Sequence, residues 1–159
     1  MSGAGRPEDA GIDGTGLRIV IVAGSWHEAI ADGLIAGARR VLEGAGAAVE
    51  LVRVPGAFEL PVATKAVLEA GADAAVALGV IVRGGTPHFD FVADAATSGL
   101  TRVALDTGKP VGFGVLTLDD EQQGLDRAGL PGSREDKGAE AAAAALRTAA
   151  TLRRLRGLS

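Results

Sequence analysis

The chain of 159 residues contains no cysteine, no tyrosine and only two histidines. Without cysteine there can be no disulfide framework and no thiol nucleophile, and two histidines without cysteine argue against a zinc site. No apolar run approaches the length of a transmembrane helix, and the N-terminus lacks the charged-then-apolar pattern of a secretory signal. From these absences we predict a cytoplasmic protein.

The net charge is small, and aromatic residues are few. The formal net charge of −4 argues against general binding of nucleic acid. Aromatic residues make up 3% of the chain and hydrophobic residues 47%, so the core must be built from Ala, Val, Leu and Ile. The length suits one domain. We expect residues 1–16 to form a flexible arm, which a neighbouring subunit could order, and residues 17–159 to form a single domain.

What the sequence does contain is a regular alternation of apolar runs and helical patterns. Strands typical of a buried parallel sheet are predicted at 17–23, 49–54, 74–82 and 110–118. Helices are predicted at 27–43, 58–70, 88–105, 119–128 and 135–156. This alternation predicts the α/β class, as a three-layer α/β/α sandwich around a four-stranded parallel sheet. Because four strands make a small sheet, partner subunits could cover part of it.

The third predicted strand leads into an unusual turn, Arg83-Gly84-Gly85-Thr86-Pro87-His88. The glycines permit a tight backbone path, Thr86 suits the N-cap of the next helix, and Pro87 suits its first position. Ligands of open α/β sheets bind at the carboxyl ends of strands, and free N–H groups at a helix N-terminus attract anions. The turn therefore predicts a ligand site. The plain alternative is a strand–helix junction with a surface histidine.

The few aromatic residues are not scattered as a core would scatter them. Four of the five follow predicted strands: Trp26, Phe58, Phe89 and Phe91. Phe113 lies within the fourth strand. Aromatic faces at the carboxyl ends of strands favour a flat heteroaromatic ligand. Alternatively, these rings plug the end of the sheet or pack against another subunit.

Four polar side chains lie close to these aromatic residues or to the nearby loops. His88 could exchange protons near neutral pH, or could simply meet solvent. Glu59 could bind a ligand, or could only complement a helix dipole. Arg127 and Lys137 flank a glycine-containing loop; an arginine there could hold a phosphate, although the residues by themselves favour solvated surface charges for both. His27 suits a turn better than a catalytic role.

Several motifs, in order and with similar spacing over roughly residues 17–155, resemble the 6,7-dimethyl-8-ribityllumazine synthase family. They are Gly56-Ala57-Phe58-Glu59-Leu60-Pro61, residues 79–84, Thr86-Pro87-His88-Phe89-Asp90-Phe91, Gly114-Val115-Leu116-Thr117, Glu121-Gln122, Asp126-Arg127-Ala128-Gly129 and Asp136-Lys137-Gly138. The resemblance implies a flavodoxin-like fold. It also implies condensation of 5-amino-6-(D-ribitylamino)uracil with 3,4-dihydroxy-2-butanone 4-phosphate, the penultimate step of riboflavin biosynthesis, without a metal or redox cofactor.

The resemblance further implies a role for each matching residue. His88 would shuttle protons. The pyrimidine and its ribityl chain would contact Trp26, Ala57, Phe58 and Glu59, with Val80, Ile81 and Val82 lining the ring site. Gly85 and Thr86 would hold the phosphate, helped by Arg127. Phe113, Arg127 and Lys137 would come from the adjacent subunit, because the family's sites lie between subunits.

The resemblance also implies a homo-oligomer. A pentamer is expected, because the loop at 130–136 is longer than in relatives that form sixty-subunit shells, and such a shell stays open as the alternative. Two other kinds of protein also stay open: a non-catalytic binder of a flavin-like ligand or shell protein on the same fold, and a flavodoxin or receiver-type signalling domain. The combination of His88 with Arg127 favours the enzyme, because a binder needs no proton shuttle. No acidic cluster follows the first strand, which disfavours a receiver.

Overall fold

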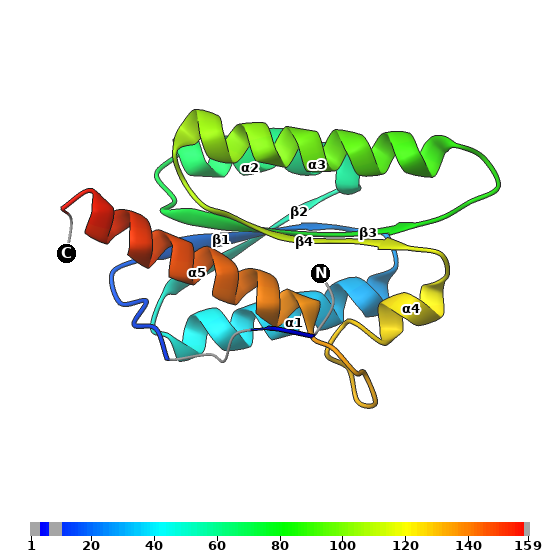
Figure 1. The fold of residues 1–159 in the computed structure, drawn as a ribbon, viewed down its shortest axis with the longest axis horizontal. Helices are drawn as coiled ribbons and strands as arrows, with labels where there is room; N and C mark the ends of the chain where they lie inside the picture. The colour runs from blue at the N-terminus through cyan, green and yellow to red at the C-terminus, as the bar shows by residue number, and fades with distance from the viewer. Residues whose placement is uncertain (1–3, 7–10, 158–159) are drawn as a thin grey trace.

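A single sheet divides the computed structural model, which describes residues 4–6 and 11–157, into two helical layers (Figure 1). The strands are β1 (Arg18–Gly24), β2 (Ala48–Val54), β3 (Ala74–Val82) and β4 (Val111–Leu118). The helices are α1 (Glu28–Gly44), the 3-10 turn η1 (Ala57–Glu59), α2 (Leu60–Glu69), α3 (His88–Thr107), α4 (Glu121–Leu125) and α5 (Lys137–Leu155). The predicted α/β/α sandwich is confirmed.

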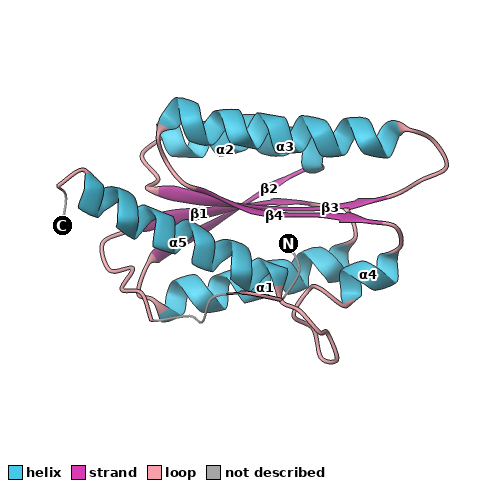
Figure 2. Ribbon diagram, viewed as in Figure 1, coloured by secondary structure: helices cyan, strands magenta, loops and turns pink. Residues whose placement is uncertain are grey.

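All four strands run parallel, in the order β2-β1-β3-β4. This is the order of a flavodoxin-like sheet. Crossovers between parallel strands are right-handed, so a step from β1 to β2 and a step from β2 back to β3 must put their helices on opposite faces. Accordingly, α1 lies on one face with α4 and α5, and α2 and α3 cover the other (Figure 2). The chain therefore reverses direction across the sheet between β1 and β3.

Each face of the sheet carries its own apolar cluster. On β1, Ile19 and Ile21 join the cluster under α1 and α5, whereas Val20 and Val22 join the cluster under α2 and α3. The alternation follows from the period of two along a strand, and it explains why central strands are apolar on both faces. The predicted Ala-, Val-, Leu- and Ile-rich core is confirmed, because no aromatic residue belongs to the fully buried set.

Glycine allows the helices to approach very closely on the α5 side. A Cβ atom at Gly138 would collide with the carbonyl oxygen of Leu34 in α1, and one at Gly112 would collide with that of Ala141 in α5. These contacts hold α5 against both α1 and the edge strand β4. The start of α5 is consequently fixed beside β4, which matters for the position of Lys137.

Most predicted element boundaries agree with the structure to within two residues, and three predictions need correction. The predicted helix at 119–128 is only α4: Asp120 caps its start by accepting a hydrogen bond from Gln123 N at 2.9 Å, and beyond its end Ala128 pairs with Asp136 in an antiparallel bridge. The predicted helix at 58–70 opens with the 3-10 turn η1. Thr86 is not the N-cap of α3: Pro87 occupies that position, and no side chain caps the helix.

The N-terminal segment is only partly described, since residues 1–3 and 7–10 of the predicted arm lie outside the described residues. Just before β1 the chain is tied to the body: Gly14 N donates to Ala45 O at 2.7 Å, and Ile12 packs against the core. Among the described residues, no helix is both long and apolar enough to cross a membrane.

Candidate functional site

The residues predicted for the site fall into two groups that lie on different strands. The first group follows the carboxyl ends of β1, β2 and β3, where the chain reverses across the sheet, and we call it the switch-point cluster. It comprises Trp26, Ala57, Phe58, Glu59, Gly85, Thr86 and His88. Strand ends at such a reversal form a crevice between diverging connections, which is where α/β sheets bind their ligands.

The turns that follow β1 and β2 are bonded directly to each other. Ser25 N donates to Pro55 O at 3.1 Å, and Ser25 Oγ donates to Val54 O at 2.8 Å. The Trp26 indole lies against Gly56, where an added Cβ would be 3.2 Å from the ring nitrogen. The indole is nevertheless 68% exposed. Its position is therefore fixed while its face stays open to a ligand.

Phe58 and Glu59 lie on η1, directly after the turn that carries Gly56. Glu59 Oε2 accepts a hydrogen bond from Gly56 N at 2.9 Å, so one carboxylate oxygen already stabilises this turn. The Phe58 ring is 65% exposed, whereas Ala57 is buried in the cluster under α2 and α3. The turn thus presents one aromatic ring outward and anchors itself through its small neighbour.

The end of β3 passes between these turns and the α3 terminus. Its side chains alternate: Val80 and Val82 pack with the α1 and α5 cluster, and Ile81 packs with Ala57 under α2 and α3. All three were predicted to line one ring site. Because their side chains leave opposite faces of the sheet, joint contact with one planar ring would have to use their backbone.

Beyond β3 the chain forms a bare turn. Every residue from 84 to 88 is exposed, and a Cβ added at Gly84 or Gly85 would meet no atom within 4 Å. Within the part of the chain that the structure describes, the backbone N–H groups of Gly85 and Thr86 have no protein acceptor. These donors face solvent beside the first turn of α3, which begins at His88. The turn can therefore accept an anion, with an imidazole next to it.

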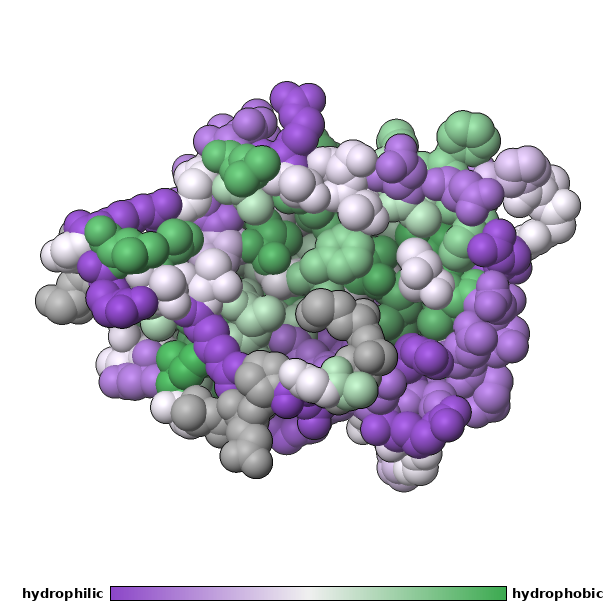
Figure 3. Space-filling model, viewed as in Figure 1, coloured by the Kyte–Doolittle hydropathy of each residue, from purple (hydrophilic) through white to green (hydrophobic). Residues whose placement is uncertain are grey.

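The second group of predicted residues lies along the edge of the sheet. Phe113, Arg127 and Lys137 line a cavity of about 890 Å³ that runs beside β4 and α5, which we call the β4-edge pocket. Figure 3 shows apolar side chains gathered in the middle of this face, between α3 and α5, with polar residues around them. Phe113 is 47% exposed there. An exposed aromatic ring on an edge strand marks a surface suited to a partner.

A short antiparallel pairing positions the two cations of this pocket. Lys137 N donates to Arg127 O at 2.9 Å, and Gly129 N donates to Glu135 O at 3.0 Å. The Arg127 guanidinium itself donates from Nη1 to Gln123 O at 2.9 Å. Residues ten apart in the sequence are thus held side by side at the start of α5.

Lys137 is surrounded by carboxylates. Its ammonium lies 2.8 Å from Glu135 Oε2 and 3.0 Å from Glu140 Oε2, and its side chain is only 15% exposed. Burial opposes the charge of Lys137, but the hydrogen bonds that its ammonium donates to Glu135 and Glu140 outweigh burial, and the pKa of Lys137 is raised. The hydrogen bond from Lys137 in turn lowers the pKa of Glu135, against the opposing effect of its burial. Arg6 extends the network, at 3.3 Å from Glu140.

Within one chain, Phe113 lies at a different level of the sheet from the switch-point cluster. In the β3–β4 register Phe113 pairs with Ala77, which precedes Ile81 by four residues. At ~3.3 Å per residue this separates Phe113 from the level of Ile81 by about 13 Å along the strands. Phe113 is therefore far from the turn that carries Gly85 and His88.

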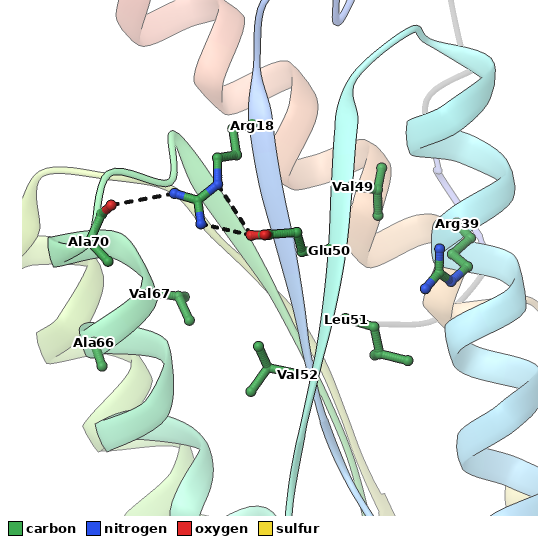
Figure 4. Close-up of a pocket in the computed structure, with 9 residues that line it drawn as sticks. All are labelled: Arg18, Arg39, Val49, Glu50, Leu51, Val52, Ala66, Val67 and Ala70. Carbon is green, nitrogen blue, oxygen red and sulfur yellow. Dashed lines mark hydrogen bonds and ion pairs between the residues drawn. The ribbon is translucent and has the colours of Figure 1, made fainter.

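A groove beside edge strand β2 contains no predicted site residue. It is lined by residues of β1 and β2 and by residues of α1 and of α2 with its C-cap, and Arg18 Nη2 there lies 2.7 Å from Glu50 (Figure 4). In the described ranges, 4–6 and 11–157, no group of three or more acidic or histidine side chains could hold a metal ion.

The structure also reveals participants that the sequence reasoning missed. Arg83 contacts residues on both sides of the bare turn, and Glu135 and Glu140 hold Lys137. Glu140 could have been found, because it lies three residues after Lys137 on a predicted helix. Arg83 could have been suspected as a cation at a strand exit. Glu135 gives no such signal, since its approach depends on the fold of the loop.

Known proteins match this chain along nearly its whole length. The sequence profile of the family described as 6,7-dimethyl-8-ribityllumazine synthase matches residues 16–153. A protein of that name from Leifsonia xyli subsp. xyli is 78% identical over 158 residues, which cover 99% of this chain and 100% of the relative. The namesake from Clavibacter michiganensis subsp. michiganensis is 65% identical over 159 residues, 99% of each chain. The one from Streptomyces avermitilis is 58% identical over 154 residues, 96% of each. With its fold, its motifs and these relatives, the chain belongs to the 6,7-dimethyl-8-ribityllumazine synthase family.

Proposed function

We propose that this chain condenses 5-amino-6-(D-ribitylamino)uracil with 3,4-dihydroxy-2-butanone 4-phosphate. The products are 6,7-dimethyl-8-ribityllumazine, phosphate and water, in the penultimate step of riboflavin biosynthesis, and the reaction takes place in the cytoplasm. Membership of the family supports the reaction. The observation that supports the assignment of this reaction to particular residues is the bare turn after β3. Its N–H donors have no acceptor among the described residues and precede His88, and an exposed indole follows the neighbouring strand β1.

The aromatic half of the switch-point cluster suits the pyrimidine. Trp26 offers an exposed face against which a heteroaromatic ring can stack. Phe58 offers a second exposed ring. Glu59 Oε2 accepts one hydrogen bond from Gly56 N, and the remaining acceptor positions of the Glu59 carboxylate can accept hydrogen bonds from ring N–H or ribityl hydroxyl groups. Ala57 and the backbone of Val80, Ile81 and Val82 would then contact the ring from the end of β3.

The turn after β3 suits the phosphate. Gly85 and Thr86 present backbone donors at the N-terminus of α3, where the helix dipole also favours negative charge. Arg127 adds a planar cation able to hold phosphate oxygens bidentately. These donors stabilise the charge that develops as the phosphate leaves.

His88 suits the proton transfers. The substrate amine attacks the ketone and loses water to give an imine; phosphate elimination and ring closure follow. Each step adds or removes a proton close to the leaving phosphate, and an imidazole can act both as acid and as base. The remaining contribution of the protein is to hold two substrates in the reacting orientation.

The complete site is shared between subunits. Phe113, Arg127 and Lys137 of one chain serve the switch-point cluster of its neighbour in a homopentamer, with a sixty-subunit shell as the larger alternative. Two observations support sharing: the ~13 Å along the strands that separates Phe113 from the level of Ile81 within a chain, and the exposed large apolar side chains on several elements, including Val62, Phe91 and Leu105. Such exposure is typical of surfaces that a partner covers.

Mixing both substrates with the purified protein tests the proposed reaction. We expect the absorbance and fluorescence of the lumazine to rise at a rate proportional to protein concentration, with one phosphate released per lumazine. Omitting either substrate provides the control. Tight binding of the pyrimidine or the lumazine without any turnover would reject the enzyme and support a non-catalytic binder.

A further inference from the structure

The bare turn after β3 has almost no bonds of its own. Residues 84–88 are all exposed, and within the part of the chain that the structure describes no acceptor receives the N–H groups of Gly84, Gly85 or Thr86. Two adjacent glycines add backbone freedom. A segment of this kind must be ordered before its donors can act together on one phosphate, and ordering costs conformational entropy. Some other part of the chain must therefore limit its motion.

A single side chain reaches across both ends of this turn. Arg83 is the last residue before it, and its backbone N–H donates to Leu118 O at 2.8 Å, which extends the pairing of β3 with β4. Its guanidinium carbon lies 4.3 Å from the centre of the Phe89 ring, and Nη1 lies 3.8 Å from Asp90 Oδ1. Phe89 and Asp90 are in the first turn of α3, on the far side of the bare turn.

The same guanidinium is anchored on a third segment. Arg83 Nε donates to Asp119 Oδ1 at 3.1 Å, and Asp119 lies between β4 and α4. The cation thus joins the end of β3, the start of α3 and the exit of β4. Stacking on an aromatic face and a charge-assisted bond are both contacts that arginine makes better than lysine.

We propose that Arg83 is a positioning residue, a clamp that closes the base of the turn and fixes Gly85, Thr86 and His88 for the reaction. The proposal rests on the proposed function of these three residues. A turn held in place before the phosphorylated substrate arrives loses less entropy on binding, so the substrate binds more tightly. A turn that moves by about 1 Å would also misplace His88, and such displacements can cost about 10²-fold in rate.

Direct contact between Arg83 and the phosphate is the competing explanation. The two make opposite predictions for Asp119. If Arg83 is a clamp, removing the Asp119 charge loosens the guanidinium and weakens the turn. If Arg83 is a phosphate ligand, the same change frees its charge for the substrate and improves binding.

The test compares four variants of the full-length protein in its native assembly: Arg83→Ala, Arg83→Lys, Asp119→Asn and the double variant Arg83→Ala/Asp119→Asn. Arg102→Ala is the matched control, because Arg102 is an exposed arginine of α3 that pairs with Asp106, one turn further along its own helix. Steady-state kinetics give kcat and KM for each substrate. Order parameters of the backbone amides of residues 84–86 and 88–90, from NMR relaxation, report the mobility of the turn without reference to activity.

We expect Arg83→Ala to raise KM for the phosphorylated substrate about tenfold and to lower kcat several-fold, with KM for the pyrimidine changed less than about twofold. Asp119→Asn should act in the same direction by a smaller factor. The double variant should be no worse than Arg83→Ala, because the two residues share one interaction. Arg83→Lys should recover only part of the loss, and the amide order parameters of residues 84–86 and 88–90 should fall in every variant except the control.

Two results would overturn the clamp. A lower KM for the phosphorylated substrate in Asp119→Asn would make Arg83 a phosphate ligand, and unchanged order parameters of the turn amides in Arg83→Ala would show that the turn is held by other contacts. The order parameters do not depend on the proposed reaction, whose failure would instead appear as absence of lumazine with the unmodified protein. Asp119→Asn leaves Arg83 in place, so it keeps the test open if Arg83→Ala assembles poorly.

Discussion

The switch-point cluster and the β4-edge pocket hold their functional groups in contrasting ways. Around the bare turn of the cluster, backbone donors and aromatic faces are exposed, and a ligand would supply their missing partners. In the pocket, the Lys137 ammonium already lies between Glu135 and Glu140, and Arg127 already donates to a carbonyl. The exposed groups of the switch-point cluster gain partners when a ligand binds, whereas the charged groups of the β4-edge pocket are paired within the protein beforehand.

This contrast indicates what the switch-point cluster and the β4-edge pocket can each contribute to substrate binding and catalysis. Exposed N–H groups and an imidazole on a turn gain most of their interactions only when substrate is present, which suits binding and proton transfer. Cations that are already paired lose existing bonds when they meet a phosphate, so their net gain is smaller. We therefore expect changes in the cluster to cost more activity than changes in the pocket.

The largest effect is expected from His88→Ala. Loss of an acid–base group typically costs 10²–10⁴-fold, and we expect kcat to fall by about 10²-fold, at the low end of that range. The substrates should bind nearly as before, because the imidazole contributes to proton transfer more than to affinity. Steady-state kinetics with both substrates measure the two quantities separately.

The second histidine provides a matched control for that experiment. His27 has a φ of 55°, which asparagine tolerates better than most residues, so His27→Asn keeps the backbone of this turn. Its side chain lies 3.7 Å from Glu121, at the start of α4. We expect kcat of His27→Asn to stay within about twofold of the unmodified enzyme. A near-normal kcat for His88→Ala would remove His88 from the mechanism.

Mixing variants tests whether the two halves meet across subunits. Arg127→Ala alone should raise KM for the phosphorylated substrate about tenfold, the effect of one charge-assisted bond. When His88→Ala and Arg127→Ala chains are unfolded and reassembled together in equal amounts, about a quarter of shared sites receive both intact residues in a closed ring. Activity under limiting phosphorylated substrate should then approach a quarter of the unmodified level, well above either parent.

The mixing experiment needs proof that the oligomers are mixed, which native mass spectrometry supplies. Each parent, unfolded and reassembled alone, is the control for losses during reassembly. If His88 and Arg127 of the same chain formed one site, no mixture could repair it. Activity equal to the average of the parents, in oligomers shown to be mixed, would contradict the shared site. His88 and Arg127 of the same chain would then serve one site.

The fold could be predicted from the sequence because it depends on local patterns of apolar and polar residues. The apolar run at 74–82 became β3 at the predicted residues, since a strand buried on both faces leaves no polar position to blur its ends. The boundaries that failed depended on competing caps. Thr86 has the chemistry of an N-cap, but its helix starts at His88 with Pro87 before it. In the helix predicted at 119–128, Asp120 caps the start of α4, and the bridge between Ala128 and Asp136 takes the last predicted residue out of the helix.

The site was less accessible from sequence because its bonds are long-range. Motif spacing led to His88, Arg127 and Lys137, and the structure brings Arg127 and Lys137 into one pocket. That Arg83 spans the bare turn depends on the distance between the end of β3 and the exit of β4, which no local pattern encodes. Which residues face one another across subunits is likewise a property of the assembly.

The smallest effect is expected from Glu135→Gln, which removes the carboxylate charge that pairs with Lys137 in the β4-edge pocket. The pKa of Glu135 is lowered from its ordinary value of 4.5 by the bond from Lys137. A lowered folded-state pKa contributes stability at pH values above the unfolded pKa, and this stability is lost as the pH falls through the folded pKa. We expect the variant to unfold about 2–4 °C below the unmodified protein at pH 7, the shift of roughly 1 kcal/mol in a domain of this size.

The difference should vanish on acidification, because both proteins then lack the charge at position 135. Thermal unfolding between pH 3 and pH 7, at one protein concentration, measures the convergence. The control is Glu43→Gln, which removes an exposed carboxylate paired with Arg39 at 3.1 Å. Solvent screens such a pair, so its loss should shift the melting temperature by less than about 1 °C.

Lys137 should show the opposite dependence on pH. Because its pKa is raised in the folded state, the stability from its pairing is complete below the ordinary pKa of 10.5 and is lost as the pH rises through the folded-state pKa. Equal shifts for Glu135→Gln and Glu43→Gln at every pH would mean that the pocket's charges are no more fixed than those of the open surface, and the contrast between the two halves would fail.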